Sequence, residues 1–145
     1  MAVDVVSEIV VARPRPEVAA FCADPDNVTS WYRNITSVEW VTAPPLSVGT
    51  RLSFVAWFLG RRIAYTYEVR EHVAGERFVM STQQGPFPMR TTYTWEDAGA
   101  GTLMRLRNAG EPTGFASVTA PMMARAVRGA NRKDLALLKQ VLEQR

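Results

Sequence analysis

The segment 115–145 constrains the fold of this chain most, because the helix that it predicts has an apolar stripe along one face. At the spacing of an α-helix, that face carries Ala120, Met123, Ala124, Val127, Ala130, Leu135, Leu138, Val141 and Leu142. The opposite face carries Arg125, Arg128, Arg132, Lys139 and Glu143. The apolar residues are mostly small in the first half and leucines in the second. We therefore expect the leucine half to close a core against a sheet and the alanine half to leave a hollow.

The residues before this helix predict an antiparallel sheet. Segments rich in β-branched or alternating apolar residues predict strands at 2–12, 35–42, 50–58, 62–72, 77–83, 87–96 and 102–109. Two short helices are expected after the first strand, one over 16–23 begun by Pro16 and one capped by Asn27 that carries Val28 and Trp31. Because the later strands follow one another through short connections, an antiparallel meander is expected.

Alternation along the predicted strands divides them into an apolar and a polar face. The apolar face collects aromatic residues and methionines: Leu52, Phe54, Ala56, Phe58, Ile63, Tyr65, Tyr67, Val69, Phe78, Met80, Phe87, Met89, Tyr93, Trp95, Met104 and Leu106. Only the C-terminal helix is long enough to cover it. This pattern fits either a pocket for an apolar, ring-containing molecule or a solid core in which large strand residues interdigitate with small helix residues. The pattern alone favours the solid core.

Composition narrows the functional class. A chain of 145 residues with 47% apolar and 21% charged residues suits one globular domain. The net charge of +3 comes from dispersed basic residues, so nucleic acid is not an expected partner. One cysteine, no signal peptide and no long apolar run indicate a cytoplasmic protein without stable membrane insertion. With one histidine and no glycine-rich phosphate loop, neither a metal nor a cofactor is expected.

Two polar residues interrupt the apolar stripe of the helix, Asn131 and Asp134. They are either ligand-orienting groups at the floor of the hollow or, as is commoner, buried groups that bond to neighbouring backbone. Pro121 conflicts with a helix over the whole segment. Either the helix begins near Thr119, or a kink makes 115–120 a movable lid.

Three further positions have two interpretations each. The alternation places His72 on the polar face of the sheet, where an exposed position is more plausible than a general base. Arg107, Asn108 and Glu111, at the end of the last strand, are either polar groups at the mouth of a cavity or a charged strand end with a capping loop. Of these three, only Asn108 falls on the apolar face of the sheet by the alternation.

Short motifs in this order resemble a known superfamily. They are Ser7-Glu8-Ile9 to Pro14, Asp24-Pro25 to Trp31, Val48-Gly49-Thr50, Tyr67-Glu68-Val69, Gly101-Thr102, and Asp134-Leu135 to Leu138-Lys139 to Leu142-Glu143. The chain resembles the START-like superfamily, also called SRPBCC, which includes polyketide cyclase/dehydrase-like and lipid-transport proteins. The resemblance covers nearly the whole chain, so 1–145 is expected to be a single domain of that kind. It implies an α+β helix-grip fold, with a seven-stranded antiparallel sheet curved around the C-terminal helix and a deep hydrophobic cavity between them.

The resemblance raises the pocket interpretation above the solid core. We expect binding or transport of a small hydrophobic molecule such as a lipid or polyketide by a monomer or homodimer. The expected ligand-binding residues are Phe54, Phe58, Tyr65, Tyr67, Met80, Phe87, Met89, Tyr93, Met104, Asn108, Met123, Val127 and Asn131. The alternatives are a metal-independent cyclase or dehydratase that uses a tyrosine or Asp134 as acid or base, and a protein-interaction or chaperone-activator module.

Overall fold

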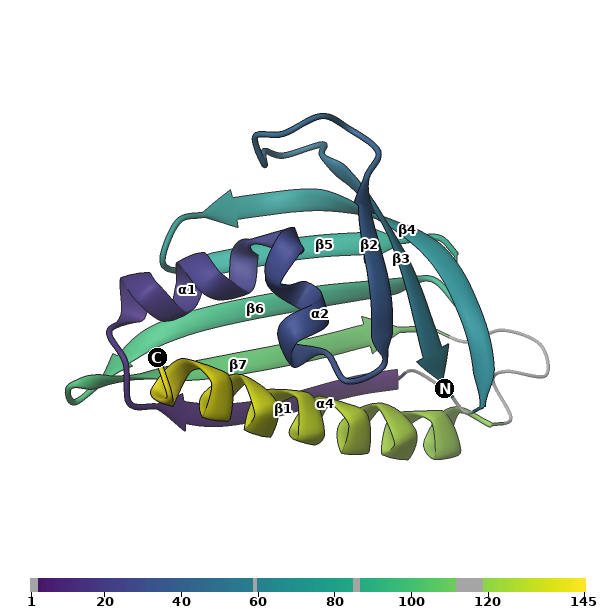
Figure 1. The fold of residues 1–145 in the computed structure, drawn as a ribbon. Helices are drawn as coiled ribbons and strands as arrows, with labels where there is room; N and C mark the ends of the chain where they lie inside the picture. Colours follow the sequence, from purple (N-terminus) through teal and green to yellow (C-terminus); the bar gives the residue numbers. More distant parts are fainter. Residues whose placement is uncertain (1–2, 59, 85–86, 112–118) are drawn as a thin grey trace.

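The computed structural model describes residues 3–58, 60–84, 87–111 and 119–145, and it confirms the α+β helix-grip fold (Figure 1). Its strands are β1 (Val3–Val11), β2 (Ile35–Trp40), β3 (Arg51–Phe58), β4 (Arg61–Val73), β5 (Arg77–Thr82), β6 (Met89–Ala98) and β7 (Gly101–Gly110). Its helices are α1 (Arg15–Ala23), a 3₁₀ turn (Pro25–Asn27), α2 (Val28–Trp31) and α4 (Ala120–Glu143).

All seven strands form one antiparallel sheet in the order β1-β7-β6-β5-β4-β3-β2. Strands β2 to β7 form a meander, and the last strand of the meander, β7, pairs with β1. The two edge strands of the sheet are therefore β1 and β2. The sheet curves around α4, and α1 and α2 fill the space beside the C-terminal half of that helix (Figure 1). Helices join β1 to β2 because these two strands lie at opposite edges of the sheet, a distance that no tight turn can span.

Helix α4 begins at Ala120, so the first of the two expectations for Pro121 is correct. Pro121 lies in the first turn, where a backbone N–H has no intrahelical acceptor and the proline ring therefore breaks no hydrogen bond. The expected apolar stripe is the buried face, with Ala120, Met123, Val127, Leu135, Leu138 and Leu142 buried and Asn131 and Asp134 buried among them. Most of the suggested lid falls in 112–118, outside the described residues.

Two local expectations are wrong. Asn27 does not cap α2; its Nδ2 donates to the Phe21 carbonyl at 3.3 Å, while the Asp24 side chain caps the 3₁₀ turn by accepting from the Asp26 N–H at 3.0 Å. The connection between the predicted strands 87–96 and 102–109 is shorter than expected, since β6 continues to Ala98, which pairs with Gly101. Gly99, with φ of +61°, makes this tight turn possible.

A bulge in β4 turns His72 toward the apolar face of the sheet, and not toward the polar face that the alternation predicts. The register with β5 shifts between Val69 and Glu71, so two successive residues project outward and the alternation reverses beyond them. His72 consequently lies opposite Phe78, an inward residue, with ring centroids 5.6 Å apart. It remains exposed, as expected, because it lies near the end of the strand.

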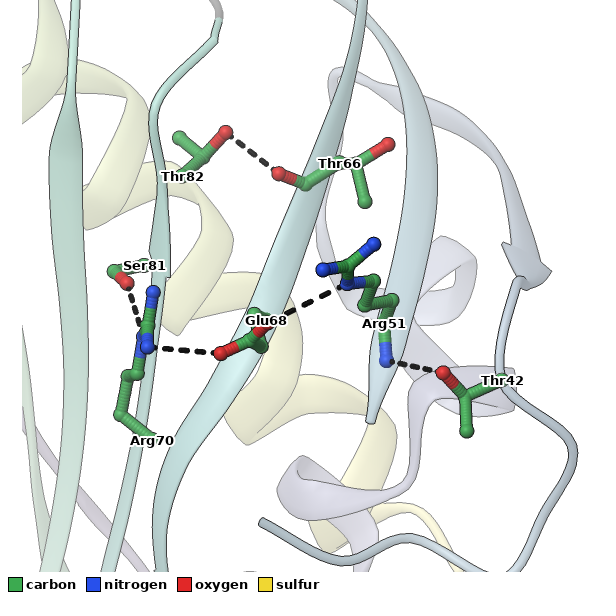
Figure 2. A network of polar contacts seen from close by, with 7 residues as sticks. All are labelled: Thr42, Arg51, Thr66, Glu68, Arg70, Ser81 and Thr82. Carbon is green, nitrogen blue, oxygen red and sulfur yellow. Dashed lines mark hydrogen bonds and ion pairs between the residues drawn. The ribbon is translucent and has the colours of Figure 1, made fainter. Parts of the chain in front are cut away.

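The face of the sheet turned away from α4 carries ion pairs within and between strands. Glu68 bridges Arg51 at 3.4 Å and Arg70 at 2.8 Å, and Arg70 also donates to Ser81 (Figure 2). Such exposed pairs contribute little to stability individually. They keep this face polar, so the apolar side chains of the sheet have one place to be buried, against the helices.

The core between the sheet and the helices has two separate clusters. The larger one joins the leucine half of α4 to α1, α2 and the centre of the sheet, with Trp31 and Leu138 fully buried. The smaller one packs Ala120, Met123 and Val127 from the first half of α4 against Val5 and Phe87. The candidate site is bordered by residues of both clusters.

Candidate functional site

A hollow of about 140 Å³ lies between the sheet and α4. The residues that border it come from α2 and the turn after it, from β2 to β7 and positions beside them, and from the middle of α4: Val28, Tyr32, Asn34, Ile35, Phe54, Ala56, Trp57, Phe58, Ile63, Tyr65, Tyr67, Met80, Thr82, Gln84, Phe87, Met89, Thr91, Tyr93, Asn108, Val127, Ala130, Asn131 and Asp134. The α4 residues Val127, Ala130, Asn131 and Asp134 share one face because they recur at helical spacing.

All but two of the expected ligand-binding residues border this hollow. Met104 lies instead in the larger core cluster, with its Sδ 3.5 Å from Cys22 Sγ. Met123 lies in the smaller cluster, one turn of α4 before Val127. Both side chains are buried, and neither of them borders the hollow.

Sequence reasoning missed two polar residues that matter, Tyr32 and Thr91. Thr91 has the same inward alternation as Met89 and Tyr93, so the pattern could have placed it on the apolar face. It was missed because the search for that face considered apolar and aromatic residues. Tyr32 follows the short helix α2, and no periodic pattern reaches that position. Only its contact with Tyr93 reveals its orientation.

One wall of the hollow is an aromatic group formed by Phe54 of β3 with Tyr65 and Tyr67 of β4. Each pair among these three rings has a centroid distance between 5.5 and 5.9 Å. The rings of Tyr67 and Tyr65 meet edge to face at 72°, which is a favourable arrangement for aromatic quadrupoles. This wall offers flat apolar surface to a ring-containing molecule.

A chain of hydrogen bonds leads from this wall to α4. The hydroxyl groups of Tyr67 and Thr91 are 3.2 Å apart, and Thr91 Oγ1 donates to Asn108 Oδ1 at 2.6 Å. Asn108 Nδ2 then donates to Asn131 Oδ1 at 3.2 Å. Asn131 Nδ2 has no acceptor among the described residues. The chain thus connects the aromatic wall to α4 through β6 and β7.

A second polar pair is formed by Tyr32 and Tyr93, whose hydroxyl oxygens are 2.6 Å apart. Burial raises the pKa of both phenols well above the ordinary value. The two groups therefore remain protonated, and they can donate a proton but do not act as phenolate bases at neutral pH.

Asp134 is the ionisable carboxyl group at this site. It is only 3% exposed, and its Oδ1 accepts the backbone N–H of Arg33 at 2.9 Å. Burial raises its pKa from 3.8 to about 6, and the bond from Arg33 opposes this only in part. Repulsion from the Asp134 carboxylate contributes to the raised pKa of Tyr32, Tyr65 and Tyr93. Asp134 can therefore exchange a proton near neutral pH.

A more polar groove on the surface adjoins this hollow. It is bordered by Arg33, Asn34, Phe58, Ala126, Gly129, Ala130, Lys133 and Asp134. Asn34, Phe58, Ala130 and Asp134 border both spaces. The groove lies where α4 has small residues, Ala126, Gly129 and Ala130.

Among the residues that the structure describes, there is no site suited to metal binding or to a cysteine nucleophile. No group of three or more His, Cys, Asp or Glu side chains is arranged there to hold a metal ion. Cys22 is buried away from the hollow, and burial raises the pKa of its thiol, so it is not an activated nucleophile. Arg107 pairs with Asp4 on the outer face and does not border the hollow. Of the described helices, none has the length and apolar character to cross a membrane.

Comparison with known proteins gives a family and a set of structural relatives. The family model described as polyketide cyclase / dehydrase and lipid transport matches residues 2–143. No curated protein matches the sequence significantly. Among solved structures, TTHA0849 from Thermus thermophilus superposes with a TM-score of 0.81 at 20% identity, over 94% of each chain.

Two di-domain ARO/CYC proteins also superpose. StfQ, from the steffimycin biosynthetic pathway, has a TM-score of 0.83 at 11% identity. BexL, from the BE-7585A biosynthetic pathway, has a TM-score of 0.79 at 23% identity. The chain is covered to 99% and 97% in these comparisons but spans only 52% of StfQ and 46% of BexL. At such identities the likeness is one of fold.

Proposed function

Because this chain belongs to the polyketide cyclase/dehydrase and lipid transport family, we propose that it binds and carries a small hydrophobic molecule in the hollow between the sheet and α4. The observation that carries the proposal is the unfilled space of about 140 Å³ beside the Phe54–Tyr65–Tyr67 wall. Kept dry and empty, a void of that size costs about 3 kcal/mol, at roughly 24 cal/mol for each Å³. An apolar occupant removes that cost and gains contact with the rings.

The proposal is tested by looking for an occupant and then by filling the hollow. Organic extraction and mass spectrometry of freshly purified protein identify any molecule that it carries. Extracted protein is then titrated with β-naphthol and followed by NMR. Shifts are expected at residues that border the hollow. No co-purified molecule and no saturable shifts with β-naphthol would refute the proposal.

A matched pair of variants on α4 separates the hollow from the rest of the surface. Ala130→Phe places a ring in the hollow and is expected to weaken β-naphthol binding at least tenfold. Ala136→Phe makes the same change at an exposed position of the same helix and is expected to leave binding unchanged. Equal binding by both variants would mean that the probe binds elsewhere.

Asp134 supports a second candidate function, a metal-independent dehydratase or cyclase. A carboxyl group with a pKa of about 6 suits a general base near neutral pH. In a dehydration, the Asp134 carboxylate takes a proton α to a ketone and then returns it to the departing β-hydroxyl, which a phenol of the Tyr32–Tyr93 pair holds by a hydrogen bond. The products are the conjugated enone and water. The electron pair of the broken C–H bond becomes the new double bond.

The two functions differ in one measurement. The aldol adduct of benzaldehyde and acetone is a β-hydroxy ketone whose dehydration product absorbs in the near ultraviolet. An enzyme of this kind produces that absorbance, and Asp134→Asn abolishes it while β-naphthol still binds. A carrier binds the compound and leaves it unchanged.

A further inference from the structure

Most polar side chains that border the hollow have partners within the protein. The hydroxyl groups of Tyr32 and Tyr93 pair with each other, and Thr82 Oγ1 donates to a backbone carbonyl oxygen at 2.6 Å. The hydrogen-bonded chain from Tyr67 to Asn131 links four more side chains. All of these side chains are neutral and have a partner in the fold, so the polar atoms left for a ligand are few.

Asp134 differs from these groups because it ionises and because one of its two carboxyl oxygens is free. Its Oδ1 accepts the backbone N–H of Arg33 at 2.9 Å. Its Oδ2 accepts no hydrogen bond from any residue that the structure describes, and it is not one of the polar atoms that the fold shuts off from solvent. A buried carboxylate depends strongly on hydrogen bonds, since burial removes most of its water. Asp134 Oδ2 is therefore the atom at which a donor on a ligand gains most.

The charges around Asp134 disfavour a ligand that carries a charge of its own. A carboxylate placed beside Oδ2 would be repelled by Asp134 and would lose its hydration. An ammonium group would also lose its hydration, and Arg33 already supplies positive charge near Asp134, with Lys133 beside the same groove. A hydroxyl group meets neither penalty, and its hydrogen bond to a carboxylate is about twice as strong as one between neutral groups.

We infer that the hollow selects neutral, ring-containing molecules that carry a hydroxyl group, and that this hydroxyl group donates a hydrogen bond to Asp134 Oδ2. The inference rests on the proposed function and adds the class of ligand to it. Asp134 and Tyr65 both border the hollow, and the Asp134 charge contributes to the raised pKa of Tyr65, so the carboxyl group lies within electrostatic range of the aromatic wall. One small molecule can therefore pack its ring on that wall and direct its hydroxyl group to Asp134.

Two nearly isosteric probes test this directly, β-naphthol and 2-methylnaphthalene, which has a methyl group in place of the hydroxyl. The measured quantity is the ratio of their dissociation constants, at a pH well above the Asp134 pKa of about 6. Asp134→Asn keeps an oxygen for the Arg33 N–H and places an NH₂ group where Oδ2 was. The relative preference for β-naphthol is expected to fall about tenfold in this variant, since a hydrogen bond to a charged group has at least that effect. Asp97→Asn, at an exposed aspartate, is the matched control and leaves the ratio unchanged.

A second measurement uses only the wild-type protein. The carboxyl carbon of Asp134 is titrated by NMR with the hollow saturated by each probe in turn. A hydroxyl group that donates to the carboxylate stabilises the ionised form, so the pKa of Asp134 is expected to be about one pH unit lower with β-naphthol than with 2-methylnaphthalene. The other titratable and charged groups that face Asp134 or border its groove are the same in both titrations: Tyr32, Arg33, Tyr65, Tyr93 and Lys133.

The outcomes separate the inference from the proposed function. A ratio that is the same in Asp134→Asn, with the same Asp134 pKa under both probes, overturns the inference while binding of both probes leaves the proposed function standing. A preference lost in Tyr65→Phe but kept in Asp134→Asn also overturns it, because the hydroxyl group would then be held at the aromatic wall. Tighter binding of 2-naphthoate than of β-naphthol would overturn the selection of neutral molecules. If neither probe binds the wild-type protein, the inference fails, and the proposed function fails with it when no molecule co-purifies.

Discussion

Replacing Asp134 with asparagine should stabilise the protein, and more so as the pH rises. The side chain is buried, and burial raises the pKa of its carboxyl group from 3.8 to about 6. Below pH 3.8 the group is protonated in both the folded and the unfolded chain, so it costs nothing. As the pH rises, the unfolded chain ionises first and the folded protein is disfavoured, until the folded carboxyl also ionises near pH 6.

The size of the effect follows from the gap between the two pKa values. At about 1.4 kcal/mol for each unit of that gap, ionising Asp134 in the fold removes about 3 kcal/mol of stability. About half of this loss occurs between about pH 5 and pH 7. The other half has already occurred by pH 5, because the unfolded chain is largely ionised there. Asparagine keeps an oxygen that can accept the Arg33 N–H and never ionises, so it escapes the loss.

The assay is urea unfolding of the wild-type protein and Asp134→Asn at a series of pH values. The difference in unfolding free energy, variant minus wild type, should rise from pH 5 to pH 7 by about 1.4 kcal/mol and then stay level. Asp97→Asn, an exposed aspartate, controls for the loss of one negative charge. A difference that is flat, or that falls with pH, would show that the fold does not disfavour the Asp134 carboxylate and would refute the reasoning.

Four further single substitutions test local packing in the fold, each measured by urea unfolding. Tyr32→Phe leaves the Tyr93 hydroxyl without its 2.6 Å partner and should cost about 1–3 kcal/mol; the double variant with Tyr93→Phe should cost less than the sum of the single variants. Gly129→Ala, which meets nothing within 4 Å in the middle of α4, should stabilise by about 0.5–1 kcal/mol. Gly101→Ala should destabilise, because its Cβ would lie 2.5 Å from the Val11 carbonyl oxygen, and equal effects at the two glycines would contradict this contrast. Leu138→Ala should cost about 2–5 kcal/mol because that side chain is fully buried, and a cost below 1 kcal/mol would mean that the cluster collapses around it.

The fold could be predicted from the sequence because its signals are local and periodic. The stripe from Ala120 to Leu142 repeats at 3.6 residues, and each strand repeats at two, so the buried face of every element can be read without knowing its neighbours. Short connections then leave the meander as the simple arrangement. The local features that were misplaced have no period: the cap expected from Asn27, the turn at Gly99 and the bulge that redirects His72.

The polar interior of the site depended on tertiary structure. Thr91, Asn108 and Asn131 come from three separate elements, and Tyr32 meets Tyr93 across 61 residues of chain. Nothing in the sequence states that these groups are within 3.2 Å of one another, because a hydrogen bond between distant segments has no period. The sequence alone determined which faces are buried. How the buried polar groups pair was decided only by the tertiary structure, because the partners come from different strands and helices that the folding of the sheet around α4 brings together.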